Sequence, residues 1–257
     1  MVSRVTGVDE HCKELNRCNQ RGGRMLSVFD LLDAGTLGID LAAYLMARIS
    51  RGASFMVGAN PGGAGKTTVM CALLNLVPAD MTLVPATAES VRRALEAQED
   101  NPVRCYVCHE FGAGHYYAYL WNRALRDYCT LSQRRHILAT NLHADTIEQA
   151  RYQVCSDNHV PAEDFRRFGL VMFMSVSGGW FEAKRRIETV WSSDGTSDHS
   201  LVYDLDGGLR RDAVDAADRR YVKRCRRFLE QSYTNGVRTI EQVREAVVRF
   251  LDSTAGR

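Results

Sequence analysis

The glycine-rich run NPGGAGKTT, residues 60–68, constrains the fold of this chain more than any other feature. An apolar run at 54–59 predicts a strand just before it, and a longer apolar run predicts a helix just after it. Gly62, Gly63 and Gly65 can adopt backbone angles that other residues avoid, so that amide N–H groups converge at the helix N-terminus. A strand, such a loop and a helix in this order predict a phosphate-binding loop in an α/β protein.

Each polar residue of the loop has a predicted task. Lys66 is placed to reach the β- and γ-phosphates of ATP, and the hydroxyl of Thr67 to ligate Mg²⁺. Asn60 stands where such loops usually open with glycine, and we expect it to be accepted because Asn tolerates left-handed backbone angles. The candidate nucleotide-binding residues are therefore Asn60, Pro61, Gly62, Gly63, Ala64, Gly65, Lys66, Thr67 and Thr68.

Strand-like and helix-like runs alternate along the rest of the chain, which is typical of a parallel sheet wrapped by helices. Strands are predicted at 54–59, 81–85, 103–108 and 135–141, and helices at 38–52, 65–77, 88–98, 116–129 and 146–154. Strands at 169–177, 185–193 and 199–205, joined by Gly- and Ser-rich segments, predict an antiparallel meander at one edge. Helices at 213–231 and 239–251 close the chain, the second with Thr239 and Gln242 in capping-box spacing.

Three regions follow from this pattern. The polar, glycine-punctuated residues 1–25 are predicted to form an arm outside the core. Residues 26–206 are predicted to form the phosphate-loop core, and residues 207–257 a helical appendage.

Composition limits the partners and the compartment. Lys+Arg 33 against Asp+Glu 31 gives a formal net charge of +2, which by itself indicates no polyanionic partner. The eight cysteines, several of them in apolar runs, suit the reduced thiols of a cytosol. No stretch approaches the ~18 consecutive apolar residues of a membrane span. We therefore expect a cytoplasmic protein that meets the inner face of a membrane only through partners.

A pair of cysteines has the spacing of a metal site but also has a simpler structural explanation. Cys105 and Cys108 have the spacing of a zinc pair, to which Cys12, Cys18 and His109 could be recruited. In an extended strand, however, residues three apart point to opposite faces, which argues against a shared zinc ion.

The basic run at 219–228 could contact nucleic acid. Acidic residues precede it, so the helix is acidic at its start and basic later, as its dipole prefers. A solvated helix face is the favoured interpretation. The aromatic residues Tyr116, Tyr117, Tyr119 and Trp121 are most simply explained by packing on the sheet or on a neighbouring subunit.

A second motif carries a resemblance to a known family. The segment ATNLHADTIEQA at 139–150 follows a predicted strand and is similar to the histidine box of the type II/IV secretion ATPase superfamily, which includes the motors of type IV pili and archaella. The lead-in at 27–68 and the segments HVPAEDFRRFGLVMFM and RRIETVW are also similar to that superfamily. The resemblance covers most of residues 27–250 and implies a RecA-like P-loop NTPase core.

The resemblance assigns roles to further residues. Glu110, at the end of the strand VRCYVCHE, matches the Walker B glutamate that organises Mg²⁺ and the attacking water. His143 matches the histidine that approaches the γ-phosphate. The implied catalytic residues are Lys66, Glu110 and His143, and the implied metal residues are Thr67 and Glu110. An acid at the carboxyl end of a strand beside the loop is where chemistry would also place metal and water.

The sequence also departs from the family. An acidic pair that helps to activate water in the family is replaced by Pro85 and Ala86, and the nearest acid is Glu89. Family members carry a large domain before the core, where this chain has about 25 residues. The arginines that could act on the nucleotide of a neighbouring subunit are Arg92, Arg93, Arg104 and Arg135, which sequence alone does not rank.

These observations predict an ATP- and Mg²⁺-dependent motor subunit that forms a ring, expected to be a homohexamer, and works with an inner-membrane platform protein of a secretion or pilus system. One alternative is a regulatory or structural subunit that binds nucleotide but hydrolyses it poorly. The other is a P-loop motor that handles DNA.

Overall fold

The structure is a computed structural model that describes residues 2–19, 22–60, 62–97, 102–114, 116–178 and 183–255. Of the candidate nucleotide-binding residues, Pro61 lies outside the described residues.

Within the described residues, nine strands form one mixed sheet in the order β2-β3-β5-β1-β6-β7-β8-β9, with β4 paired to β3 beside this path. Neighbouring strands from β2 to β6 are parallel, and those from β6 to β9 are antiparallel. The predicted α/β class, a mostly parallel sheet with an antiparallel meander at one edge, is confirmed. The strands are β1 (Phe55–Gly58), β2 (Thr82–Pro85), β3 (Arg104–Phe111), β4 (Tyr119–Leu120), β5 (Ile137–Leu142), β6 (Leu170–Ser177), β7 (Lys184–Ser192), β8 (Ser200–Asp204) and β9 (Gly208–Leu209).

Strand order brings the candidate residues to one edge of the sheet. The glycine-rich loop leaves β1, which lies between β5 and β6. Parallel strands end at the same edge, so the carboxyl ends of β3 and β5 lie beside the loop. Because Gly58 pairs with Leu142, His143 follows β5 at the level of the loop, and Glu110 lies near the end of neighbouring β3.

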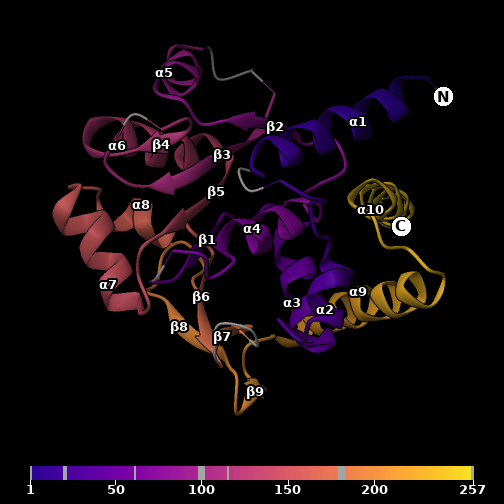
Figure 1. Ribbon diagram of the computed structural model, residues 1–257. Helices are drawn as coiled ribbons and strands as arrows, with labels where there is room; N and C mark the ends of the chain where they lie inside the picture. The colour runs from indigo at the N-terminus through magenta and orange to yellow at the C-terminus, as the bar shows by residue number, and fades with distance from the viewer. Residues whose placement is uncertain are drawn as a thin grey trace.

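Helices cover both faces of the sheet (Figure 1). Alternate residues of β1 belong to different hydrophobic clusters, Phe55 and Val57 to one and Met56 to the other, as strand geometry requires. The helices of the first face are α1 (Val2–Arg17), α2 (Val28–Asp33), α3 (Ile39–Ile49), α4 (Lys66–Leu74), α9 (Ala216–Thr234) and α10 (Ile240–Ala255). Those of the second are α5 (Ala88–Glu96), α6 (Asn122–Thr130), the 3-10 turn η1 (Leu131–Arg134), α7 (Ile147–Arg151), the π-helical turn η2 (Tyr152–Asp157) and α8 (Ala162–Arg166).

The first residues do not form an arm outside the core, so that prediction is wrong. Helix α1 packs against α10 and β2, and Cys12, Leu15 and Cys18 are 3%, 0% and 1% exposed. Three small or apolar residues at a spacing of three form a narrow stripe along one side of a helix. The polar composition of the segment concealed this stripe. The boundary proposed between residues 206 and 207 stays a prediction.

The predicted helix over 116–129 begins later than expected, at Asn122. Tyr119–Leu120 forms β4 instead, held beside β3 by bonds from His109 N to Ala118 O and from Gly112 N to Leu120 O. Ala118 has a φ of 55°, which interrupts helical geometry at this point. Residues 116–121 of the predicted helix are therefore not helical, and two of them pair with the sheet instead.

Helix α10 begins at the predicted capping box. The amide of Gln242 donates to Thr239 Oγ1 at 3.3 Å, and the amide of Thr239 donates to Gln242 Oε1 at 3.2 Å. In the described part of the chain, no helix is both long enough and apolar enough to cross a bilayer.

Arg244 anchors α10 to the segment that follows α4. It is 2% exposed, and its guanidinium donates to the carbonyls of Asn75, Val77, Pro78 and Ala79 over 2.6–3.2 Å. Burial lowers the pKa of Arg244 to about 10. The side chain therefore holds the irregular segment after α4 in place through the carbonyls of that segment.

Arg244→Met is expected to lower the free energy of unfolding by about 3 kcal/mol, since it removes charged hydrogen bonds and leaves buried carbonyls unpaired. Urea titration measures the change. Arg249→Met on the same helix is the matched control, because Arg249 is 72% exposed. A loss below ~1 kcal/mol for Arg244→Met, or an equal loss in the control, would show that the guanidinium is not an anchor.

Candidate functional site

The glycine-rich loop has the backbone that its sequence predicts at two positions. Gly63 and Gly65 have φ of 91° and 96°, in the region that favours glycine. Gly65 is the N-cap of the nine-residue α4 and makes no side-chain cap, so the first amides of the helix remain open to a ligand. Gly62 does not adopt a positive φ.

Lys66 lies inside the loop rather than in solvent. Its side chain is 7% exposed, and Nζ donates to Ala59 O at 3.2 Å and to His143 Nδ1 at 3.4 Å. Nζ also lies 3.6 Å from Glu110 Oε2. Burial lowers the pKa of Lys66, and the nearby Glu110 opposes that shift. The lysine is thus held at the loop by groups from β1, β3 and the end of β5.

The structure brings together the three residues assigned to catalysis. His143 Nε2 lies 2.5 Å from Glu110 Oε1, while the other ring nitrogen faces Lys66. Since Lys66 can only donate, Nδ1 accepts, and the proton of a neutral His143 is assigned to Nε2, which donates to Glu110. Glu110 is 13% exposed and His143 is 47% exposed, so the histidine forms the open side of the group.

Thr67 and Glu110 present the oxygen donors that Mg²⁺ prefers. Asn141 lies between Thr67 and the strand that carries Glu110. Its Nδ2 donates to Thr67 Oγ1 at 3.4 Å and to the carbonyl of His109 at 2.8 Å. Asn141 is completely buried, and its Oδ1 has no hydrogen-bond partner. A buried acceptor without a partner, on the side chain that contacts the Thr67 hydroxyl, suits a water of a hydrated cation. These residues therefore fit Mg²⁺.

Asn60 is accepted for a different reason from the one predicted. Its φ is not positive. Instead, its backbone amide donates to Asp145 Oδ1 at 2.6 Å, and its side-chain Nδ2 donates to Asp145 Oδ2 at 3.0 Å. Asp145 is held in turn by its own amide, which donates to Gln149 Oε1. The start of the loop is thus tied to the segment after His143.

Pro85 and Ala86, which stand where the family has an acidic pair, bring no carboxylate to the site. Pro85 ends the edge strand β2, and the amide of Ala86 donates to Val107 O. Glu89, the nearest acid in the sequence, is 62% exposed and pairs with Arg93. Within the described chain, Glu110 is therefore the carboxylate that contacts Lys66 and His143.

None of the four arginines predicted to act on a neighbouring nucleotide has a described contact with the loop of this chain. Arg92 and Arg93 pair with Glu96 and Glu89 along the exposed side of α5. Arg104 begins β3 and Arg135 precedes β5, at the edge opposite the loop. Their action on a second subunit stays a prediction.

The N-terminal helix reaches the strand that carries Glu110. Cys18 Sγ lies 3.3 Å from His109 Nε2. A hydrogen bond with Cys71 and the contact with His109 lower the pKa of Cys18, and burial opposes this shift. Burial by itself would lower the pKa of His109. The hydrogen bond and charge of Cys18 outweigh burial, so the pKa of His109 is raised. This contact joins α1 to α4 and β3.

Cys105 and Cys108 belong to hydrophobic clusters on opposite faces of the sheet. Among the described residues, no group of three or more His, Cys, Asp or Glu is arranged to hold a metal ion. Burial raises the pKa of Cys105 above its usual range and that of Cys108 to about 12, so both are protonated thiols.

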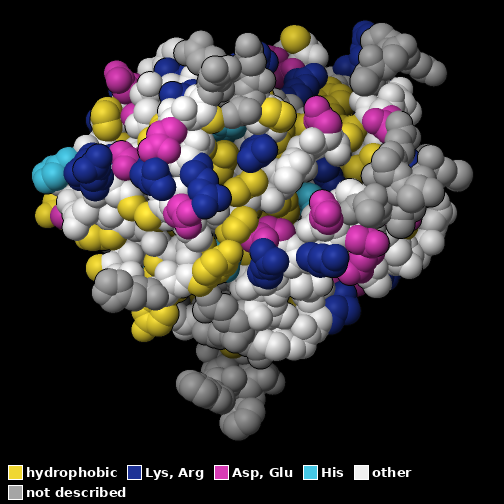
Figure 2. Space-filling model, turned by 90° about the horizontal axis from the view of Figure 1, so that it is seen from above, with side chains coloured by type: hydrophobic (Ala, Val, Ile, Leu, Met, Phe, Trp, Pro, Cys, Tyr) yellow, Lys and Arg dark blue, Asp and Glu magenta, His cyan; other side chains and the backbone are white. Residues whose placement is uncertain are grey.

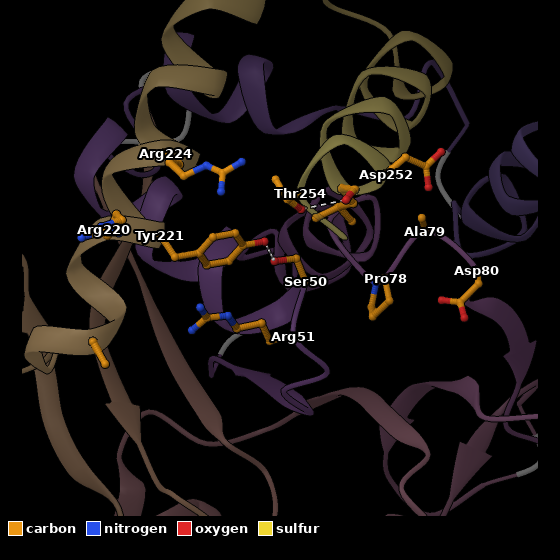
Figure 3. A pocket seen from close by; sticks show the side chains of 12 residues that line it. Ser50, Arg51, Pro78, Ala79, Asp80, Arg220, Tyr221, Arg224, Asp252 and Thr254 are labelled. Atoms are coloured by element: carbon orange, nitrogen blue, oxygen red, sulfur yellow. Dashed lines mark hydrogen bonds between the residues drawn. The ribbon is translucent and has the colours of Figure 1, made fainter. Parts of the chain in front are cut away.

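The basic helix α9 lines a cavity of about 730 Å³, together with Ser50 and Arg51 after α3 and with residues of α10 (Figure 3). Arg224 and Tyr221 face it from α9, whereas Asp80 and Asp252 line it from the other side, so charges of both signs surround it (Figure 3). Elsewhere on α9, Arg226 pairs with Asp40 and Glu230. Basic and acidic side chains are also mixed over the face in Figure 2.

A hollow of about 570 Å³ opens beside the loop. Asn60 and His143 line it together with the aromatic side chains of Trp121 and Tyr152. Tyr152 is 62% exposed, and Tyr116 and Tyr117 are 70% and 50% exposed. Tyr116, Tyr117 and Tyr152 are thus open to solvent, whereas Tyr119 lies in β4 of the sheet and Trp121 packs against a hydrophobic cluster, as predicted.

Three residues of the site escaped the sequence analysis: Asn141, Asp145 and Arg185. Arg185 in β7 donates from Nε to Gly63 O at 3.1 Å. Asn141 and Asp145 stand within the histidine box, so their place in that motif was an available signal. Arg185 lies 122 residues from Gly63, and only the sheet order brings them together.

No protein-family model matches the chain, and no curated protein matches it. Among solved structures, the chain is similar to the VirB11 ATPase of the Brucella suis type IV secretion system in complex with sulphate, with 20% identity and a TM-score of 0.42 over 63% of this chain and 54% of that one. It is also similar to the ATPase DotB of Yersinia pseudotuberculosis, with 12% identity and a TM-score of 0.44 over 86% of this chain and 62% of that one. For DotB of Legionella pneumophila the values are 11%, 0.40, 85% and 57%.

The chain thus spans between about half and three fifths of the length of these proteins. Their TM-scores are below 0.5, so function is inferred from this chain's own residues. The resemblance to the type II/IV secretion ATPase superfamily rests on the motifs at 60–68 and 139–150.

Proposed function

We propose that this chain binds Mg-ATP at residues 60–68 and hydrolyses it as a motor subunit of a secretion or pilus-like assembly. The observation that carries this proposal is the contact of Lys66, Glu110 and His143 at the carboxyl edge of the parallel strands. A cation on an open helix N-terminus suits a phosphate chain, and a carboxylate beside it suits an attacking water.

Each side chain has a role in this proposal. Lys66 exchanges its bonds with Ala59 O and His143 for phosphate oxygens. Glu110 orients the attacking water and accepts its proton. Thr67 and Glu110 would hold Mg²⁺, which neutralises phosphate charge when bound. Asn141 fixes the hydroxyl of Thr67 and, through its free Oδ1, binds a nearby water.

His143 couples the phosphate to neighbouring structure. Its two ring nitrogens face Lys66 and Glu110, so withdrawal of Lys66 toward phosphate removes one of its partners. His143 can then form a hydrogen bond with another group, and the segment that contains Asp145 moves with it. ATP-bound and ADP-bound subunits would in this way hold their neighbours at different angles.

We also propose that the active form is a homohexameric ring with nucleotide between subunits, located in the cytoplasm and bound to an inner-membrane platform protein. The exposed Tyr152 beside the loop supports this proposal, because large exposed aromatic side chains are enriched at interfaces. Mass and turnover should be measured together. We expect Mg-ATP to shift the mass from 28.8 kDa toward six copies and turnover to rise with assembly. A monomer that hydrolyses ATP at an unchanged rate at all protein concentrations would contradict the ring.

One observation favours the hydrolysis-poor alternative. Pro85 and Ala86 replace the acidic pair of the family, and Glu89 is engaged by Arg93 away from the site. Tight Mg-ATP binding without turnover in the assembled protein would select this alternative over the motor.

A further inference from the structure

Arg185 approaches the phosphate loop from the antiparallel part of the sheet. Strand β7 runs back along β6 from the edge where the loop lies, and Arg185 pairs with Val176 near the end of β6. Its Nε donates to Gly63 O at 3.1 Å. A Cβ placed on Gly65 would lie 3.3 Å from Arg185 Cδ, so the side chain rests against the loop backbone.

The guanidinium has unused donors. Besides Gly63 O, it contacts Ala183 O, at 3.5 Å from Nη1. Among the described residues, no carboxylate pairs with it, and the side chain is exposed. A guanidinium carries five N–H donors in a planar fork that matches phosphate oxygens, so most of them remain available to a ligand.

The charged side chains around the loop favour the presence of a second cation. Lys66 is balanced by Glu110, and Asp145 adds a second carboxylate at Asn60. Lys66 and the two carboxylates therefore sum to a negative charge beside a site proposed for a polyanion. Arg185 restores neutrality at the loop, in addition to any metal ion.

We propose that Arg185 is a second phosphate-binding cation of the nucleotide site, supplied by the same subunit as Lys66. This inference rests on the proposed nucleotide binding. The ligand is the polyphosphate tail of a nucleotide, and the guanidinium contacts it with the donors that Gly63 and Ala183 leave free. The bond to Gly63 O keeps the side chain at the loop before the nucleotide arrives.

The test compares wild type with Arg185→Ala, Arg185→Lys and Arg186→Ala by calorimetric titration of Mg-ATP at low and high salt. Arg185→Ala should raise the Kd about 10- to 100-fold at low salt and reduce its salt dependence, since a charged hydrogen bond is lost. Arg185→Lys should keep most of the salt dependence. Arg186 is the neighbouring residue of β7 and points to the opposite face, so Arg186→Ala should change the Kd less than twofold.

The outcomes separate this inference from the proposed function. Wild type and Arg185→Ala binding within twofold of each other, while Lys66→Ala does not bind, would overturn the role of Arg185 and leave nucleotide binding intact. A weaker Arg185→Ala with unchanged salt dependence would mean that the arginine only braces Gly63, which also overturns the inference. A wild-type chain that binds no Mg-ATP would overturn both.

Discussion

Lys66→Ala is expected to abolish measurable Mg-ATP binding, raising the Kd by at least about 100-fold. The change removes charge-assisted bonds to phosphate of ~1.5–3 kcal/mol each. It also leaves Glu110, now 3.6 Å from the ammonium, without its balancing charge where a polyanion must bind. Calorimetric titration measures the Kd directly.

Lys223→Ala serves as the control for this change, because Lys223 is an exposed lysine on α9. It should bind Mg-ATP as wild type does. Thermal unfolding must show that Lys66→Ala is folded. A folded Lys66→Ala variant with wild-type affinity would remove the loop from the nucleotide site.

Glu110→Gln should separate binding from hydrolysis. The amide keeps an oxygen that can accept from His143 Nε2, so the Kd for Mg-ATP should change less than about tenfold. Turnover should fall about 10²- to 10⁴-fold, because the base that orients and deprotonates water is lost. Phosphate release at saturating Mg-ATP measures kcat.

Glu89→Gln is the matched control for hydrolysis. Glu89 is the acid nearest to the replaced family pair, but it is exposed and paired with Arg93, so its loss should leave kcat unchanged. If Glu89→Gln abolished turnover and Glu110→Gln did not, the catalytic carboxylate would be Glu89, acting from α5.

The parallel part of the fold followed directly from the sequence, because its signals are local. An apolar strand, a loop with Gly63 and Gly65, and the helix at Lys66 are contiguous. Glu110 lies near the end of β3, and His143 follows β5 directly. Helix α1 was missed because its buried residues Cys12 and Leu15, with Cys18 directly after the helix, form a stripe that is narrow among polar neighbours. Its burial depends on α10 and β2, which no local pattern reveals.

Most residues of the candidate site could be predicted because they lie in local sequence motifs. The prediction was incomplete because other residues reach the loop only through the order of the strands. Lys66, Glu110 and His143 each mark a strand end or a loop, and the sheet order brought them into contact. Asn60 was expected to depend on its backbone tolerance, whereas the structure gives it a carboxylate partner, Asp145. Arg185 opens the segment RRIETVW, but nothing in that segment indicates a contact with the loop, and strand pairing brings it there.

The N-terminal helix gives the site a connection that a phosphate loop does not require. Cys18 contacts His109, which precedes Glu110, and Leu15 O accepts from Cys71 of α4 at 4.0 Å. A shift of α1 would therefore reach both the loop helix and the strand of the proposed base.

Titration of the wild-type chain with Mg-ATP and with a slowly hydrolysed analogue tests the central claim most directly, that the amides and Lys66 of this loop hold a triphosphate. The expected result is heat for both ligands, one site per chain and a micromolar or lower Kd. Absence of heat for both ligands in the folded protein would contradict the claim.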